Sequence, residues 1–248
     1  MFLQTEALVV KTVDFSESSL VLTLFSRDFG KIRTIAKGGR RIKGPFESAL
    51  DLMAHILVTY IAKRGDVLDL LAESKLVRRF RPTQENYGGM YAGYYLIELL
   101  NEMTIEQEPM PELFDAAVET LSQLMTGKSI LPSIMRFEWQ LLELTGHFPS
   151  LDFCVQCDAE IDHTARRIAF GHLDGGVVCP NCRPRTQQVS IIKPELLAAI
   201  KQLSAGSGLS AVTDRCQGQM RVLLNQYISH LIGKRPVMFD YFETMWNP

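Results

Sequence analysis

Four of the five cysteines stand in two closely spaced pairs. FCVQC and VCPNC place Cys154, Cys157, Cys179 and Cys182 in the pattern C-x2-C, 21 residues, C-x2-C. This spacing lets both thiolates of one turn reach the same ion, and two such turns complete the sulfur tetrahedron that suits Zn²⁺. We therefore predict one zinc ion in preference to two disulfides. Four sulfurs leave no open coordination position, so the site is expected to be structural and not catalytic.

Two histidines, His163 and His172, lie inside the same loop and are rival ligands. We interpret each first as a solvated loop histidine. The fifth cysteine, Cys216, falls in an apolar helical stripe and is expected to be a small buried side chain.

The stretch KIRTIAKGGRRIKG, residues 31–44, carries six cations and no acid, although the whole chain has a formal net charge of −2. Residues 1–81 hold 14 Lys and Arg against 9 Asp and Glu, whereas residues 82–152 hold 2 against 11. Like charges repel, so an external anion compensates such a cluster unless its members simply stand apart in water. The cations of the stretch are Lys31, Arg33, Lys37, Arg40, Arg41 and Lys43. Lys31 and Arg33 are two residues apart on a predicted strand, so we expect them to face the same side.

No motif of an enzyme is present. AKGGR lacks the pattern of a phosphate-binding loop, and there is no G-x-S-x-G and no H-x-E. Glu98, Glu102 and Glu106 recur every four residues and could share a helix face, but a solvated acidic face is the commoner meaning of this spacing. We expect a protein without catalytic residues.

The first 80 residues have the pattern of short strands. We expect strands near residues 7–15, 19–25, 31–36, 52–62 and 67–77, which are rich in Val, Leu, Ile and Thr and partly alternate. Five strands without a helix-length period between them suit a small barrel.

The period then changes to that of helices, which we predict over residues 87–103, 111–125, 133–145, 194–203 and 212–231. Ser133 is expected to cap the third helix, with Gly146 closing it. The cysteine-rich insert separates the third and fourth helices, and its RRIAF and DGGVV segments suggest a strand and a turn into the next strand. No run of about 20 apolar residues and no signal peptide occur, so a soluble cytoplasmic protein without a membrane partner is expected.

Several ordered stretches together resemble the RecO family of bacterial recombination mediators. They are TEALVVKTVDFSESSLVLTLFSRDFGKIRTIAKGGRR, YYLIELL, FEWQLLELTGHFPSLDFCVQC and FGHLDGGVVCPNC. The resemblance implies a multidomain α+β protein: an OB-type β-barrel over residues 1–81 and an α-helical domain over residues 82–248, with a zinc ribbon inserted at residues 153–185.

The resemblance also implies a function. Members of the family bind single- and double-stranded DNA, anneal complementary strands, and help load the recombinase onto DNA coated with single-strand-binding protein. RecR and the acidic, hydrophobic tail of the single-strand-binding protein are the implied partners, and a cytoplasmic, nucleoid-associated location follows. For the tail pocket in the helical domain, the candidate cations are Arg136, Arg215 and Arg221, since the helical segments contain few others.

OB barrels bind nucleic acid through a basic groove with aromatic platforms. The cations of residues 31–43 would form the groove's charged wall, and Arg78, Arg79 and Arg81 either extend the phosphate track or belong to a solvated linker. Candidate platforms are Phe15, Phe25, Phe29 and Tyr60, although barrel core is the favoured role for most of these rings.

Two alternatives from other classes stay open. In the first, the chain is a zinc-ribbon interaction scaffold whose basic loop binds an acidic protein. In the second, it is a nucleic-acid hydrolase that uses Glu98 and Glu102. Salt-dependent binding of single-stranded DNA favours the mediator over the scaffold, and the hydrolase requires metal-dependent cleavage.

Overall fold

The computed structural model describes residues 1–41, 46, 49–63, 65, 67–81, 86–127, 129–204 and 214–243. Lys43 lies outside these described residues. Within the chain two compact units form, one from Met1–Ile134 together with Pro236–Pro248 and one from Met135–Arg235.

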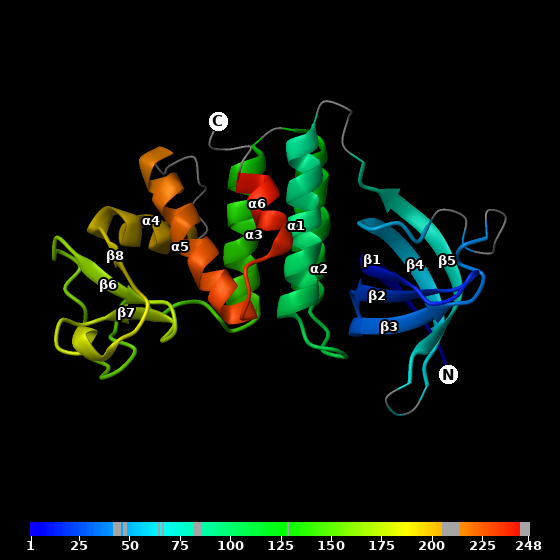
Figure 1. Cartoon of the computed structure of the whole chain (residues 1–248), viewed down its shortest axis with the longest axis horizontal. Coiled ribbons are helices and arrows are strands. Elements are labelled where there is room, and N and C mark those ends of the chain that lie inside the picture. Colours follow the sequence, from blue (N-terminus) through cyan, green and yellow to red (C-terminus); the bar gives the residue numbers. More distant parts are fainter. Residues whose placement is uncertain are drawn as a thin grey trace. The chain divides into compact units, whose positions relative to one another are not determined.

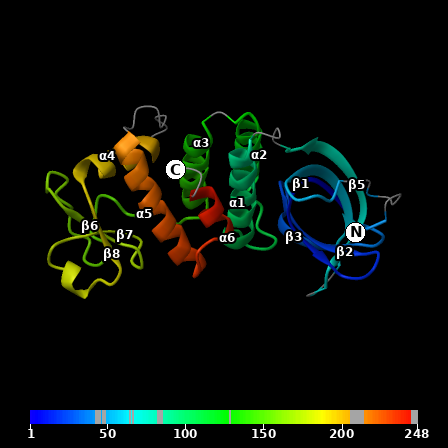
Figure 2. The same ribbon diagram turned by 45° about the horizontal axis from the view of Figure 1, so that its top comes forward.

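The first unit begins with a closed five-stranded barrel (Figures 1 and 2). Its strands are β1 (Phe2–Asp14), β2 (Leu20–Ser26), β3 (Gly30–Ala36), β4 (Ala54–Ile61) and β5 (Asp69–Arg79). They are hydrogen-bonded in the order β1-β2-β3-β5-β4, and β4 pairs back to β1. All pairs are antiparallel except β3 with β5. The predicted five strands are thus confirmed.

Alternating side chains separate the barrel interior from its surface. In β3, Ile32 and Ala36 are buried while Arg33 is exposed, and Leu22, Leu24, Ile56 and Val58 from β2 and β4 have no exposed surface. Successive side chains of a strand point to opposite faces, so every second residue enters the barrel core.

Three helices complete the first unit: α1 (Tyr87–Met103), α2 (Pro111–Met125) and α6 (Val237–Glu243). Figure 1 shows α6 and α2 beside α1. The side chain of Asn86 accepts a hydrogen bond from the Gly89 amide and so caps α1. Glu98 in α1 accepts hydrogen bonds from the amides of Val237 and Met238, which fixes the start of α6. The sequence analysis had not predicted α6.

The barrel packs directly against α2. Phe114 of α2 lies 6.2 Å from the ring of Phe25 and 5.5 Å from that of His55, measured between ring centroids. Arg27 and Asp115 form a bidentate ion pair, in which two guanidinium nitrogens donate to the two carboxylate oxygens. Helices α1 and α2 therefore belong to the same compact unit as the barrel.

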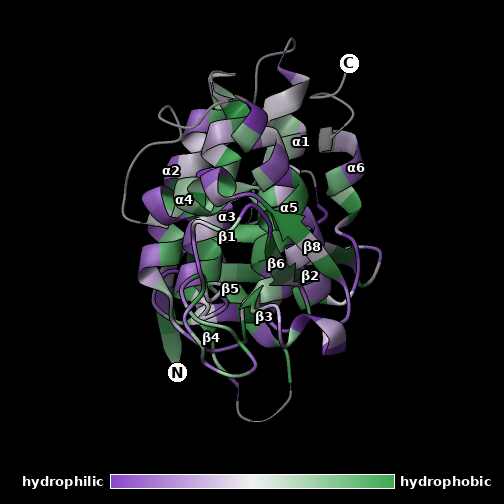
Figure 3. Cartoon of the chain, turned by 90° about the vertical axis from the view of Figure 1, so that its left-hand side faces the viewer, coloured by the Kyte–Doolittle hydropathy of each residue, from purple (hydrophilic) through white to green (hydrophobic). Residues whose placement is uncertain are grey.

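The second unit contains most of α3 (Ile130–Leu144), then β6 (Ile168–Gly171), β7 (Gly176–Val178), the short 3₁₀ helix η1 (Arg183–Arg185), β8 (Val189–Ile192), α4 (Pro194–Ser204) and α5 (Asp214–Ile232). The three strands form a sheet in the order β7-β6-β8, and β6 and β8 carry the hydrophobic colour in Figure 3. Phe170 of β6 meets Tyr227 of α5 edge to face at 5.7 Å, which places the sheet on that helix.

Two local predictions need correction. Helix α3 begins at Ile130 and not at Ser133, whose hydroxyl instead donates to the side chain of Gln123. The cysteine-rich insert does not end its sheet at residue 185, because β8 pairs with β6 up to Ile192. The end of α3 is as predicted: Gly146 follows it with a φ of 73°, a left-handed conformation that glycine adopts without strain.

Candidate metal centre and nucleic-acid interface

The four paired cysteines converge on one point. The sulfurs of Cys154, Cys157, Cys179 and Cys182 all lie within 4.8 Å of one another, and those of Cys157 and Cys179 are 3.7 Å apart. Four sulfurs at about 2.3 Å from a tetrahedral Zn²⁺ are roughly 3.8 Å apart, so the cluster fits such an ion.

Two turns hold the sulfurs in place. The amide of Cys154 donates to the carbonyl of Ala159, and that of Asp158 donates back to the carbonyl of Cys154. Cys179 follows β7 directly, and its carbonyl accepts from the amides of Cys182 and Arg183. Each turn is therefore held by backbone hydrogen bonds between residues close in sequence, and the amide of Val155 ties the first turn to Val177 of β7.

The protonation of these thiols also favours a cation among them. Burial opposes ionisation of Cys154, but hydrogen bonds from the backbone amides of Cys179, Gln156 and Cys157 outweigh it and bring its pKa down to about 6. The neighbouring sulfurs of Cys157 and Cys179 raise the pKa of Cys182 to about 12. Four thiolates so close together repel one another, and a divalent cation removes that repulsion.

The rival histidines have other partners. His163 lies 3.5 Å from a carboxylate oxygen of Asp152 and 3.1 Å from the ammonium of Lys201. His172 is buried, and its Nε2 is 2.8 Å from the hydroxyl of Ser190. Cys216 is half-buried in α5. Among the described residues, the cluster of possible metal ligands consists of the four paired cysteines.

Three of the predicted DNA-contacting cations gather in the turn after β3. Lys37, Arg40 and Arg41 are exposed there, and Gly38 has a φ of 79° that lets the chain reverse. The guanidinium of Arg40 reaches Asp14 at 3.1 Å and the carbonyl of Ser16 at 3.3 Å, so this turn lies against the loop between β1 and β2.

Lys31, another of the predicted DNA-contacting cations, is engaged by other parts of the chain. Its ammonium donates to the carbonyls of Asn101 and Thr104 at 2.7 and 2.6 Å, where α1 ends. Burial lowers its pKa, although Glu106 and Glu102 oppose that shift. Lys31 therefore closes the C-terminal end of α1 against the barrel, where cations satisfy the last carbonyls of a helix.

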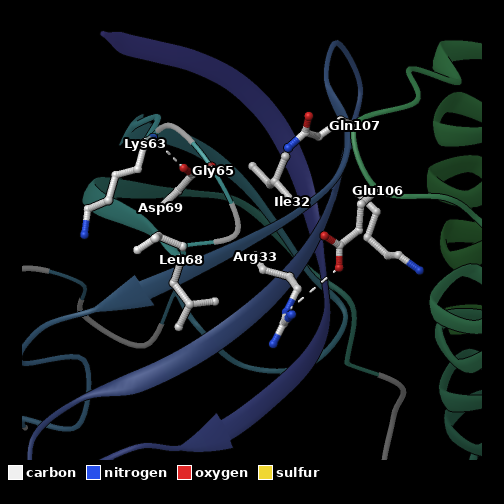
Figure 4. A pocket seen from close by; sticks show the side chains of 10 residues that line it. Ile32, Arg33, Lys63, Gly65, Leu68, Asp69, Glu106 and Gln107 are labelled. Carbon is white, nitrogen blue, oxygen red and sulfur yellow. Dashed lines mark hydrogen bonds and ion pairs between the residues drawn. The ribbon is translucent and has the colours of Figure 1, made fainter.

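Arg33 lies on the same side of β3 as Lys31, as the alternation predicted. Its Nε is 3.9 Å from a carboxylate oxygen of Glu106, and both line a polar pocket with Lys63 and Asp69 (Figure 4). Figure 4 shows Arg33 and Glu106 directed toward one another. This pocket has charges of both signs, so Arg33 meets an anionic partner within the chain.

The arginines at the end of β5 are also engaged. Arg78 donates to the hydroxyl of Ser122 and lies 5.9 Å above the ring of Phe80. Arg79 and Arg81 approach the same carboxylate oxygen of Asp51, at 3.7 and 3.4 Å. Arg78 and Arg81 remain exposed.

Of the candidate aromatic platforms, one is open to solvent. Tyr60 is 2% exposed and belongs to the barrel core, whereas Phe25 has no exposed surface because it packs against Phe114 of α2. Phe29 packs against the ring of Tyr60 and is partly buried. Phe15 is 63% exposed, in the loop that Arg40 contacts. The sequence could not tell which of these rings is exposed, because the alternation of a strand does not extend into the loop that carries Phe15.

The three arginines predicted for a partner-tail pocket differ in their surroundings. Arg221 is bound to the carboxylate of Glu138, which has no exposed surface, and is thus committed inside the second unit. Arg136 and Arg215 are exposed.

A groove in the second unit has the features expected of such a pocket. Ile191 and Val222, 36% and 53% exposed, lie in it with three cations, Arg166, Arg167 and Lys193. This groove could not be predicted from the sequence, because its residues come from β8, α4, α5 and the segment before β6. The residue that could have pointed to the groove is Val222, an apolar side chain that is exposed on α5.

Of the three acidic residues considered for catalysis, Glu98 and Glu102 belong to α1 and Glu106 does not. Glu98 binds the start of α6, and Glu106 lies beyond the end of α1, beside Arg33. Glu102 is exposed within α1. In the part of the chain that the structure describes, no helix has the length and apolar character needed to cross a membrane.

Comparison with known proteins assigns the family. The family models described as Recombination protein O N terminal and Recombination protein O C terminal match residues 1–80 and 84–238. DNA repair protein RecO of Rhodopirellula baltica is 36% identical over 258 residues, covering 94% of this chain and 96% of the relative. The proteins of that name from Myxococcus xanthus and Syntrophus aciditrophicus are 29% and 28% identical, covering 97% and 93% of this chain and 96% and 91% of theirs. The chain therefore belongs to the RecO family of DNA repair proteins.

Proposed function

We propose that this chain is a non-enzymatic, DNA-binding mediator of recombinational repair. It binds single- and double-stranded DNA, anneals complementary strands and helps load a recombinase onto DNA coated with single-strand-binding protein. Membership in the RecO family supports the repair role. The exposed cations Lys37, Arg40 and Arg41, beside the exposed ring of Phe15, support the DNA contact.

The barrel supplies the frame for this contact. Its strand order, with β3 parallel to β5 and β4 returning to β1, suits an OB-type barrel, a fold that binds oligonucleotides at one face and its loops. Cations that track phosphates give affinity without sequence preference, and a solvent-exposed ring lets any base stack.

An annealing assay tests the proposal. Two complementary fluorescent oligonucleotides are mixed with the protein, with and without single-strand-binding protein. We expect faster annealing in both cases, together with salt-dependent binding of either strand alone. Binding to neither strand at low salt would leave the zinc-ribbon scaffold with an acidic protein partner as the better account.

We propose zinc as the metal of the four-cysteine cluster, one structural ion per chain. The sulfur distances fit that ion, as does a cluster that consists, among the described residues, of four cysteines. The residues that hold it are Cys154, Cys157, Cys179 and Cys182, and it would stabilise the β6–β8 sheet that packs on α5.

We further propose that the groove of Ile191 and Val222 takes the tail of the single-strand-binding protein. An aromatic residue at the end of the tail would enter the apolar floor, and its carboxylates would meet Arg166, Arg167 and Lys193. RecR is a second proposed partner, for which we assign no residues. A nucleoid-associated location follows from these contacts.

A fluorescent acidic peptide with a C-terminal phenylalanine tests the groove. Val222→Glu places a carboxylate on its floor and should weaken binding at least tenfold, as should Arg167→Ala with Lys193→Ala. The matched control Val237→Glu changes another exposed valine, located on α6. Equal affinities for all variants would place the tail elsewhere.

A further inference from the structure

A pocket lies where β5 ends and α1 begins, entirely within the first unit. Its walls combine three aromatic residues, Phe80, Tyr87 and Tyr94, with two arginines, Arg79 and Arg81. Neither the metal cluster nor the turn after β3 contributes to it. Its aromatic residues take no part in the DNA contact or the groove proposed above.

The rings offer an open face. Tyr87, the first residue of α1, is 59% exposed, although a large aromatic side chain normally buries most of its surface. Tyr94 follows seven residues later and so lies on the same side of the helix. Phe80 is 3% exposed and packs below, with the guanidinium of Arg78 over its ring. The accessible aromatic surface is therefore chiefly that of Tyr87.

The charges favour an anion beside these rings. Arg79 and Arg81 share one carboxylate oxygen of Asp51, at 3.7 and 3.4 Å, so two positive charges face one negative charge. The side chain of Arg81 is 69% exposed and can turn to another acceptor. Asp51 is 52% exposed, so this pairing is screened by water and easily exchanged.

An aromatic face next to exposed arginines matches the chemistry of one nucleotide. A base stacks on the ring, and its phosphate takes hydrogen bonds from a guanidinium. Bases inside a duplex are already stacked and cannot enter such a pocket, whereas those of a single strand can. We propose that this pocket holds one unstacked base of single-stranded DNA on Tyr87, with the adjoining phosphate on Arg81. This inference rests on the proposed DNA-binding function and adds to it a contact that a single strand makes and a duplex does not.

Asp51 then acts as the competitor of the phosphate. In the free protein its carboxylate holds Arg79 and Arg81 in the pocket. Bound DNA must displace Asp51 from Arg81, so removing the carboxylate's charge should strengthen DNA binding.

The test compares two oligonucleotides of equal length, one with all bases and one with a wholly abasic backbone. Their phosphates are the same in number, so only the bases differ. The parent should bind the base-containing strand more tightly. In Tyr87→Leu that preference should fall about tenfold, the effect of one lost stacking contact, and Tyr87→Phe should retain it.

Phe2→Leu is the matched control, since Phe2 is 67% exposed and lies outside the pocket. It should keep the parent's preference for bases. The variant Asp51→Asn should bind both strands severalfold more tightly than the parent does. Adding Arg81→Ala to that variant should remove the gain.

The outcomes separate this inference from the proposed function. A parent that binds neither oligonucleotide refutes both. Salt-dependent binding of both oligonucleotides, with the same preference for bases in Tyr87→Leu as in the parent, refutes only the pocket. A loss of preference in Phe2→Leu equal to that in Tyr87→Leu would also refute it, because the base would then have no particular place.

Discussion

Arg221 of α5 and Glu138 of α3 form an ion pair in which the carboxylate has no exposed surface and the arginine side chain is 11% exposed. The pair joins two helices of the second unit. A buried ion pair gains little over well-packed apolar residues, but either partner left alone is a buried, uncompensated charge. Arg221 therefore holds α5 against α3 and does not present a free cation to a binding partner.

Breaking this pair should destabilise the second unit. We expect Arg221→Ala to lower the free energy of unfolding by about 3–5 kcal/mol, because the buried carboxylate of Glu138 then loses this arginine. The double variant Arg221→Met with Glu138→Leu should recover much of that loss. Chemical denaturation of the parent, the single variants and the double variant measures the effect. Additive losses in the double variant would mean that the two residues act independently.

The four-cysteine cluster predicts one bound zinc ion per chain. Cys157→Ser should abolish stoichiometric zinc and increase hydrogen exchange in residues 150–192 more than in the barrel, since structural zinc contributes about 10–16 kcal/mol to small domains. Cys216→Ser, at a cysteine outside the cluster, should leave both unchanged. Elemental analysis and hydrogen exchange measure the two effects, and purified parent without metal would be the opposing result.

The turn after β3 predicts a salt-dependent contact with phosphates. The variant Lys37→Ala, Arg40→Ala, Arg41→Ala should bind all single-stranded sequences more weakly and flatten the plot of log K against log salt. Each lost phosphate contact reduces the slope by about 0.7. Thermal unfolding should change little, because exposed charges contribute little to stability.

A control of the same kind uses Arg183→Ala with Arg185→Ala, two exposed cations of the second unit. Fluorescence anisotropy at a series of salt concentrations compares the slopes. If this control and the turn variant lose the same slope, the effect belongs to net charge and not to the turn.

Lys31 should behave unlike the neighbouring cations of its stretch. Lys31→Met removes the ammonium that two carbonyls at the end of α1 accept, so the free energy of unfolding should fall by about 1.5–3 kcal/mol. The slope of DNA binding against salt should stay as in the parent. Lys75→Met, at an exposed position of β5, is the control and should change stability little. A flatter salt slope in Lys31→Met would restore this residue to the DNA surface.

The ion pair of Asp115 with Arg27 should make the stability of the protein depend on pH in the acid range. The hydrogen bond and charge of Arg27 lower the pKa of Asp115 below 3.8, against a smaller opposing effect of burial. Because the pKa is lower in the folded state, its stabilising contribution is present above pH 3.8 and is lost as the pH falls through the folded pKa. Arg27→Gln should raise the pKa of Asp115 in an NMR titration and be less stable than the parent only above that range. An unshifted carboxylate titration would contradict the pairing.

The sequence by itself determined the features that depend on near neighbours. Two C-x2-C turns present their sulfurs through local backbone hydrogen bonds, so spacing alone predicted the cysteine cluster. Helices α1 and α2 have the predicted bounds, because apolar period and the residues at their ends are local signals. Alternation likewise predicted that Lys31 and Arg33 lie on one side of β3.

Only the tertiary structure decided what those side chains meet. Lys31 looked like its neighbours in sequence, yet it binds carbonyls some 70 residues away. Arg221 binds the carboxylate of Glu138, which lies 83 residues earlier in the chain. Strand β8 pairs with β6, although the second cysteine turn lies between them in sequence. Likewise, Phe25 is buried against α2 while Phe15 stays exposed. A local pattern predicts the helix or strand to which a residue belongs and the side it faces. The partner of its charge is set by segments distant in sequence, which come together only when the chain folds.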